Sequence, residues 1–131
     1  MGTTYHGAGG DASCGGSDYT NVHDCPDGGA ILAFEPFGNT PSDSPRVFSF
    51  AKDQNGVGRI YKSENGQPAV PITAPEVSID SVTFYVVGTT RGDNIQPKIV
   101  IVVKGTAGVS GSSAQTTFHV QATAVQRALD L

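Results

Sequence analysis

The sequence contains no tryptophan, only two cysteines and one methionine, and charged residues make up only 15% of its 131 positions. No run of strictly apolar residues is longer than that of Ile99–Val103, which is far shorter than the roughly 20 residues that a membrane-spanning helix needs. Eight basic and twelve acidic residues give a formal net charge of −4, which argues against a basic nucleic-acid-binding surface. The first residues form no hydrophobic segment, so we expect no signal or transit peptide in this sequence.

Glycine, proline and apolar residues are present in amounts that suit a small folded domain. There are 17 glycines and 8 prolines, so turns must be frequent, and 37% of the residues are hydrophobic. This composition is sufficient for one modest core, and the length fits a single domain. We expect a polar, irregular leader over residues 1–28 and one head domain over residues 29–131.

Short apolar runs between turn signals predict three strands in the first half of the head: Ala30–Phe34, Arg46–Ala51 and Gly58–Lys62. Asn55-Gly56 and Asn65-Gly66 offer the positive-φ positions of tight hairpins, so this region is predicted to be a β-meander. The segment Pro68–Thr73 is extended, but its prolines cannot donate ladder hydrogen bonds. It is therefore expected at a sheet edge, where Pro68 and Pro71 would block unwanted pairing.

The second half predicts longer strands over Val77–Val87, Lys98–Lys104 and Thr116–Val125, with polar loops over residues 88–94 and 105–113. The middle strand is apolar on both faces and should be central. In the first strand, alternation places one face at Val82, Phe84 and Val86 and the other at Ile79, Ser81, Thr83 and Tyr85. In the last strand, we expect Phe118, Val120, Ala122 and Ala124 inward, and Thr117, His119, Gln121 and Thr123 outward. The prediction is an all-β fold of about seven antiparallel strands.

Cys14 and Cys25 lie in a segment rich in Gly, Asp and Ser that cannot order itself by burial. A disulfide closing this loop of about ten residues would contribute on the order of 2–3 kcal/mol. Two alternatives stay open, namely free thiols and a metal site that adds His6, His23, Asp24 and Asp27, including a calcium ion near the two aspartates. Neither the CxxC nor the EF-hand spacing is present. A disulfide implies export to an oxidising compartment.

No residue pattern indicates catalysis, and we assign no catalytic, metal or cofactor-binding residue. His119 falls on the outward face of a strand, and the leader histidines His6 and His23 have no nucleophile-elbow partner. The acidic residues are scattered, and the glycine clusters never open a helix that could bind phosphate. The tripeptide Arg91-Gly92-Asp93 is a known adhesion signal, but it is also ordinary turn chemistry.

Seven stretches follow one another along the chain in a recognisable order: Thr4–His6, Cys14, Asp24–Gly29, Val70–Val77, Ile79–Gly88, Asp93–Gly108 and Thr116–Arg127. Together they resemble the head of a prepilin-type protein, in particular a bacterial minor pilin or J-type minor pseudopilin. Their order and spacing agree with that family over most of the chain. The family's basic leader, its peptidase cleavage site and its hydrophobic helix of about two dozen residues have no counterpart here.

The resemblance implies a non-catalytic structural subunit of a type IV pilus or a type II secretion-like pseudopilus. Its partners would be other pilin or pseudopilin subunits, with no small-molecule substrate. Its location would be the periplasm or cell surface, anchored to the inner membrane before assembly only through the missing helix. An exposed strand such as Thr116–Val125 would suit pairing with a neighbouring subunit by edge addition.

The alternative is a secreted β-sandwich module that binds carbohydrate or protein ligands. Five aromatic residues could supply a ligand platform for such a module: Tyr5, Tyr19, Phe37, Tyr61 and Tyr85. Saturable binding in a ligand screen would favour this alternative over the structural subunit.

Overall fold

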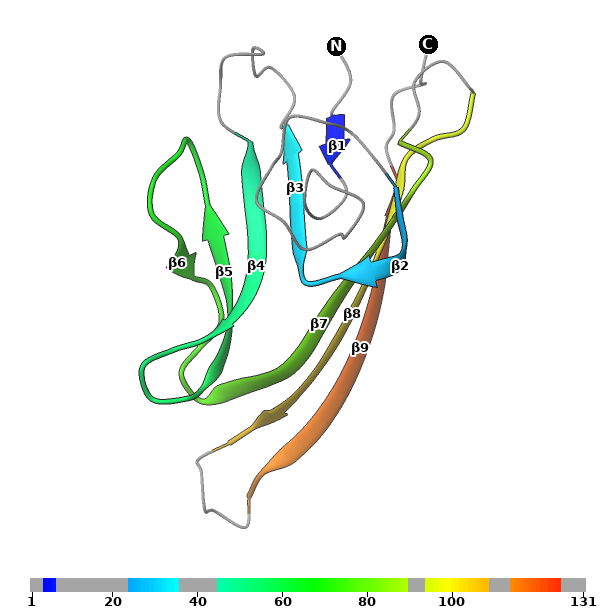
Figure 1. The fold of residues 1–131 in the computed structure, drawn as a ribbon. Coiled ribbons are helices and arrows are strands. Elements are labelled where there is room, and N and C mark those ends of the chain that lie inside the picture. The colour runs from blue at the N-terminus through cyan, green and yellow to red at the C-terminus, as the bar shows by residue number, and fades with distance from the viewer. Residues whose placement is uncertain (1–3, 7–23, 36–44, 90–93, 109–113, 126–131) are drawn as a thin grey trace.

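The structure is a computed structural model that describes residues 4–6, 24–35, 45–89, 94–108 and 114–125. These residues form nine strands in two antiparallel sheets, which confirms the all-β prediction with two strands more than expected (Figure 1). The strands are β1 (Thr4–His6), β2 (Cys25–Gly29), β3 (Ile31–Glu35), β4 (Arg46–Lys52), β5 (Gly58–Ser63), β6 (Val70–Pro71), β7 (Val77–Val87), β8 (Lys98–Ala107) and β9 (Thr116–Val125). Within this described part there is no helix long and apolar enough to cross a membrane.

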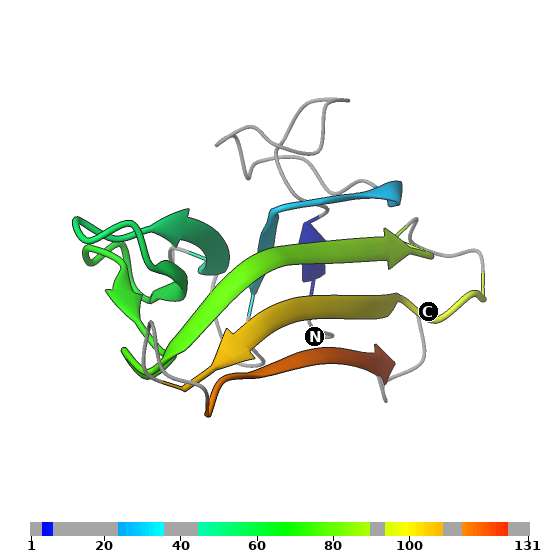
Figure 2. The ribbon, with the colours of Figure 1, turned by 90° about the horizontal axis from the view of Figure 1, so that it is seen from below.

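One sheet has the order β1-β3-β4-β5-β6, and the other has the order β2-β7-β8-β9. The chain passes between the sheets at Ala30, since β2 pairs with β7 while β3 pairs with β1 and β4. In the second sheet β8 lies between β7 and β9, as its two apolar faces predict, and β9 is the outermost strand (Figure 2). As expected from its prolines, β6 is an edge strand.

The core lies between the two sheets and depends most on β7. Seven buried residues form the cluster at the centre of this core: Cys25, Leu32, Ile79, Val82, Phe84, Val86 and Ile99. Half-buried residues from the first sheet pack against them, including Phe34 and Phe48, whose rings stack at a centroid distance of 5.9 Å. Burial of large side chains of this kind supplies most of the stability of a small β domain.

A β-bulge changes the faces of β7 from those predicted. Ile79 pairs with Gly105 and Ser81 pairs with Lys104, so Asp80 is an extra residue in β7. A bulged strand loses its simple alternation at that point. Ile79 is consequently buried with Val82 in the core, and its predicted place on the opposite face is wrong.

The expectation of an irregular leader over 1–28 also needs correction, because this segment contains β1 and most of β2. The β2 sequence Cys-Pro-Asp-Gly-Gly has no strand periodicity, but it pairs with β7 through an irregular register. Gly28 has a φ of +87° and lies directly against Thr83 and Tyr85, where a Cβ would collide with both side chains. The strand therefore depends on backbone pairing and on the absence of a side chain at Gly28.

The two Asn-Gly turns differ from each other. At Asn65-Gly66 both residues have positive φ, 53° and 69°, as a type I′ turn requires. At the first turn only Gly56 has positive φ, and the side chain of Asp53 accepts hydrogen bonds from the N–H groups of Asn55 and Val57. This first loop is organised by an aspartate, which the dipeptide alone does not indicate.

The strand β8 runs three residues further than predicted, to Ala107, and so includes residues assigned to the 105–113 loop. Gly105 allows this extension because its backbone lies against the Phe118 ring and the Ser78 carbonyl oxygen, each 2.7 Å from where a Cβ would stand. A glycine inside a strand commonly marks such a close approach rather than a strand end.

Candidate functional site

The free edge of β9 is the most distinctive surface of the described residues. All ten residues of β9 pair with β8 on one side, from Thr116 opposite Ala107 to Val125 opposite Lys98, without any register shift. On its other side β9 has no strand neighbour among the described residues. The N–H and C=O groups of an edge strand that point away from its sheet can template another strand.

The apolar face of β9 is largely uncovered, although alternation predicts it to be inward. Phe118 is half-buried, but Val120 is 52% exposed, and Ala122 and Ala124 are exposed as well. Their partners across the ladder, Val103, Ile101 and Ile99, all pack in or against the core, so the predicted face is right and only its burial is wrong. The first sheet contacts the second mainly along β7, and the edge strand lies about 10 Å further out.

We call Phe118, Val120, Ala122 and Ala124 the β9 stripe. It continues the core outward to the edge of the sheet, and it adjoins the unpaired backbone of β9. A surface with both features can accept a partner strand through main-chain hydrogen bonds and bury apolar area at the same time.

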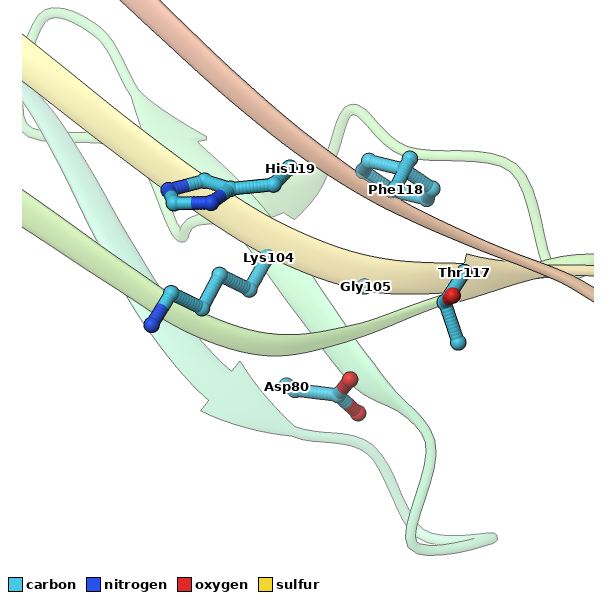
Figure 3. Close-up of a pocket in the computed structure, with 6 residues that line it drawn as sticks. All are labelled: Asp80, Lys104, Gly105, Thr117, Phe118 and His119. Carbon is cyan, nitrogen blue, oxygen red and sulfur yellow. The ribbon is translucent and has the colours of Figure 1, made fainter.

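A shallow hollow of about 330 Å³ lies beside the β7 bulge (Figure 3). It is lined by the polar residues Asp80, Lys104, Thr117 and His119 together with Gly105 and Phe118. Lys104 and His119 are ladder partners whose side chains extend in one direction, whereas the Asp80 carboxylate points the other way. No ion pair joins Asp80 to Lys104, so the hollow contains separate polar groups rather than a coupled acid–base pair.

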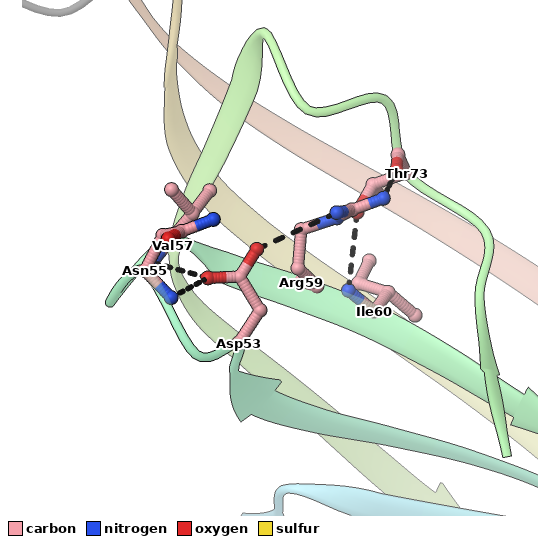
Figure 4. Close-up of polar contacts among 6 residues, drawn as sticks. All are labelled: Asp53, Asn55, Val57, Arg59, Ile60 and Thr73. Carbon is pink, nitrogen blue, oxygen red and sulfur yellow. Dashed lines mark hydrogen bonds and ion pairs between the residues drawn. The ribbon is translucent and has the colours of Figure 1, made fainter.

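Arg59 on β5 is the centre of a second polar cluster (Figure 4). This cluster joins β5 to the loop between β4 and β5 and to the chain that follows β6. Its guanidinium lies 3.6 Å from the Asp53 carboxylate and donates hydrogen bonds to the hydroxyl and carbonyl oxygens of Thr73. The Thr73 hydroxyl also accepts a hydrogen bond from the N–H of Ile60 at 3.2 Å. Every polar group here is used to fasten the chain after β6 onto β5, so the cluster is structural.

This cluster predicts a specific pH dependence. Partial burial by itself would raise the pKa of Asp53, but hydrogen bonds from Val57 and Asn55 and the Arg59 guanidinium together lower it below 3.8. A lowered carboxyl pKa stabilises the folded state above the unfolded pKa, and this contribution is lost as the pH falls through the folded pKa. The stability advantage of the wild type over Asp53→Asn should therefore be full near neutral pH and shrink below about pH 3.8.

Urea unfolding of both proteins between pH 2 and 7 measures this difference. Asp80→Asn is the matched control, because Asp80 is exposed and makes no ion pair within the described part of the chain. A constant difference between the wild type and Asp53→Asn across the whole range would contradict the prediction.

The leader residues proposed as metal ligands are only partly described. The Asp24 carboxylate accepts hydrogen bonds from the backbone N–H and the hydroxyl of Thr89, at 2.8 and 2.7 Å, and so fastens the start of β2 to the end of β7. No group of three or more His, Cys, Asp or Glu able to hold a metal occurs among the residues that the structure describes. Cys14, His23 and the Arg91-Gly92-Asp93 tripeptide lie outside these residues, as does the side chain of His6.

Of the five aromatic residues considered as a ligand platform, the two whose side chains are described lie on different sheets. Tyr61 is on β5 of the first sheet and Tyr85 is on β7 of the second, where its ring lies over Gly28. Tyr19 and Phe37 lie outside the described residues, and the side chain of Tyr5 does too. Sequence reasoning missed the Arg59–Asp53–Thr73 cluster, because Arg59 and Thr73 are 14 positions apart and no motif joins them.

The site is therefore best described by its geometry: a long free strand edge with an uncovered apolar stripe, and a shallow polar hollow lined by residues of β7, β8 and β9. Comparison of the chain with protein-family models, with curated proteins and with solved structures gave no match.

Proposed function

We propose that this chain is a non-catalytic structural subunit that acts by protein–protein assembly, as the head of a prepilin-type protein of the minor pilin or minor pseudopilin kind. The observation that carries the assembly role is the β9 edge, which offers ten regular residues and an exposed apolar stripe. An edge of this kind promotes pairing with another chain unless it is protected.

The prepilin assignment rests on the resemblance described above. In support of it, the segments that carry the resemblance in the second half of the chain fold as the consecutive strands β6, β7, β8 and β9. Three of them, β7, β8 and β9, lie side by side in one antiparallel sheet, while β6 belongs to the other sheet. Loops at the ends of such a sheet can vary without loss of the frame.

The experiment that tests the assignment is to read the coding sequence immediately upstream of Met1. We expect codons for a short basic leader, a Gly-Phe-x-x-x-Glu-like junction and about twenty apolar residues. A conventional cleavable signal peptide, or a stop codon, directly before residue 1 would refute the prepilin assignment. Saturable glycan binding would then favour the secreted binding module.

The proposal includes export to the periplasm or cell surface, and with it the Cys14–Cys25 disulfide. Cys25 is completely buried in the core, while Cys14 lies outside the described residues. We expect the intact mass of the non-reduced protein to be about 2 Da below that of the reduced protein, and reduction to lower the free energy of unfolding by about 2–3 kcal/mol.

Reduction is a cleaner test than substitution, because replacing Cys25 would also leave a cavity in the core. The check is mass spectrometry of protein purified from an oxidising compartment, followed by denaturant unfolding with and without reductant. Two free thiols in that protein would contradict the disulfide.

A further inference from the structure

The four sheet edges of the described residues differ in how well they resist pairing. The edges of the first sheet are β1, with three residues, and β6, with two residues, one of them Pro71. At one edge of the second sheet, β2 contains Pro26 and an irregular register. Short strands, prolines, bulges and charged side chains are the usual protections of a sheet edge.

The fourth edge, β9, has none of these protections. It is ten residues long, its register with β8 is regular, and its sequence Thr-Thr-Phe-His-Val-Gln-Ala-Thr-Ala-Val has no proline, lysine, arginine, aspartate or glutamate. Among the described strands, β9 is therefore the edge most open to the addition of another strand.

A second β9 fits this edge. We consider two β9 strands paired antiparallel about a two-fold axis perpendicular to the sheet. Directly opposite residues of such a pair project their side chains from the same face of the sheet. The β9 stripes of the two copies would therefore form one continuous apolar surface on that face. With the axis at Val120, Phe118 of each copy lies opposite Ala122 of the other, and Thr117 lies opposite Thr123. Paired threonines are favourable cross-strand neighbours.

Charge is also compatible with this pairing. The described charged residues nearest to β9 are Lys98 and Lys104 on β8, which pair with Val125 and His119. In the register centred on Val120, His119 lies opposite Gln121 of the second copy, and Gln121 is itself paired with Val102. Lys104 therefore faces uncharged residues across the new ladder, and among the described residues this register brings no like charges together.

We propose that two copies of this chain pair antiparallel through β9 and join their four-stranded sheets into one continuous eight-stranded sheet. This inference rests on the assembly role proposed above for β9 and names its partner. The two copies gain main-chain hydrogen bonds along β9, and each buries part of the other's stripe.

The test is analytical ultracentrifugation of the intact chain from about 1 to 500 µM, with two lysine variants. Val120→Lys places two ammonium groups at the two-fold axis and should weaken dimerisation by about tenfold or more. Val70→Lys is the matched control, since Val70 is 55% exposed on the edge strand β6, against 52% for Val120 on β9. It should leave the dimer unchanged. Equal thermal unfolding midpoints would show that both variants fold.

Hydrogen exchange of the wild type provides a second measurement that needs no variant. Amides in residues 116–125 should gain protection as the concentration rises, while those of β6 should not. A wild type that is monomeric over the whole range, equal weakening by both variants, or protection gained on another strand would overturn the proposal. The codons upstream of Met1 are independent of this result, so failure of the dimer and failure of the prepilin assignment can be told apart.

Discussion

Gly58→Ala should destabilise the domain by roughly 3 kcal/mol or more, a large effect for a single methyl group. Gly58 is the first residue of β5, and its backbone lies directly against the backbone of Ile79 on β7. An added Cβ would overlap the carbonyl oxygen of Ile79 and lie 2.9 Å from its carbonyl carbon and 3.0 Å from the Phe50 ring. Backbone atoms cannot rotate away as a side chain can, so the sheets would have to separate.

Gly56→Ala is the control, because it lies two positions away in the same hairpin. Gly56 has a φ of +78° but no atom within 4 Å of a Cβ, so the substitution should cost only the left-handed backbone strain, about 1–2 kcal/mol. Denaturant unfolding of both variants gives the comparison. A greater loss for Gly56→Ala would show that backbone conformation, and not contact between the sheets, decides the cost.

Phe84→Ala should cost about 3–5 kcal/mol, because it removes the largest of the buried side chains that β7 contributes to the core. Phe84 is 3% exposed and pairs with Ile101 on one side and Gly29 on the other. Gly29, the partner of Phe84 on β2, has no side chain that could fill the space left by the Phe84 ring, so the cavity would persist.

Tyr85→Ala is the matched control on the adjacent residue, which points to the opposite face and is half-buried over Gly28. We expect a loss of about 1–2 kcal/mol there, mainly from lost contact area. The check is again denaturant unfolding, with equal m-values required for the comparison. Similar losses for the two variants would mean that the outer face of β7 contributes as much as the core.

The sequence is most informative where a residue type has one physical meaning. Apolar strand patterns and flanking turns predict the bounds of β7 and β9 correctly, and the prolines around β6 predict its edge position. The apolar centre of β8 predicts its central place. These are local properties, so one chain segment is enough to reveal them.

The failures have a common cause, which is that pairing and coverage are set by distant residues. The bulge at Asp80 exists only relative to β8, and β2 is a strand only because β7 pairs with it. Alternation in β9 gives the face of each side chain, but whether that face is covered depends on how far the first sheet extends. The β9 edge was expected as an exposed strand, whereas its exposed stripe and the Arg59 cluster required the structure.

The passage of the chain between sheets at Ala30 has a consequence for the order of folding. The strands β7, β8 and β9 are successive hairpin partners, but Cys25 on β2 pairs with Val86, about sixty residues later in the chain. Contacts between distant residues form slowly, so we expect β2 to join the sheet after the three-stranded meander exists. Cys25 is completely buried once β2 has joined, so we expect any oxidation of this cysteine to precede the pairing of β2 with β7.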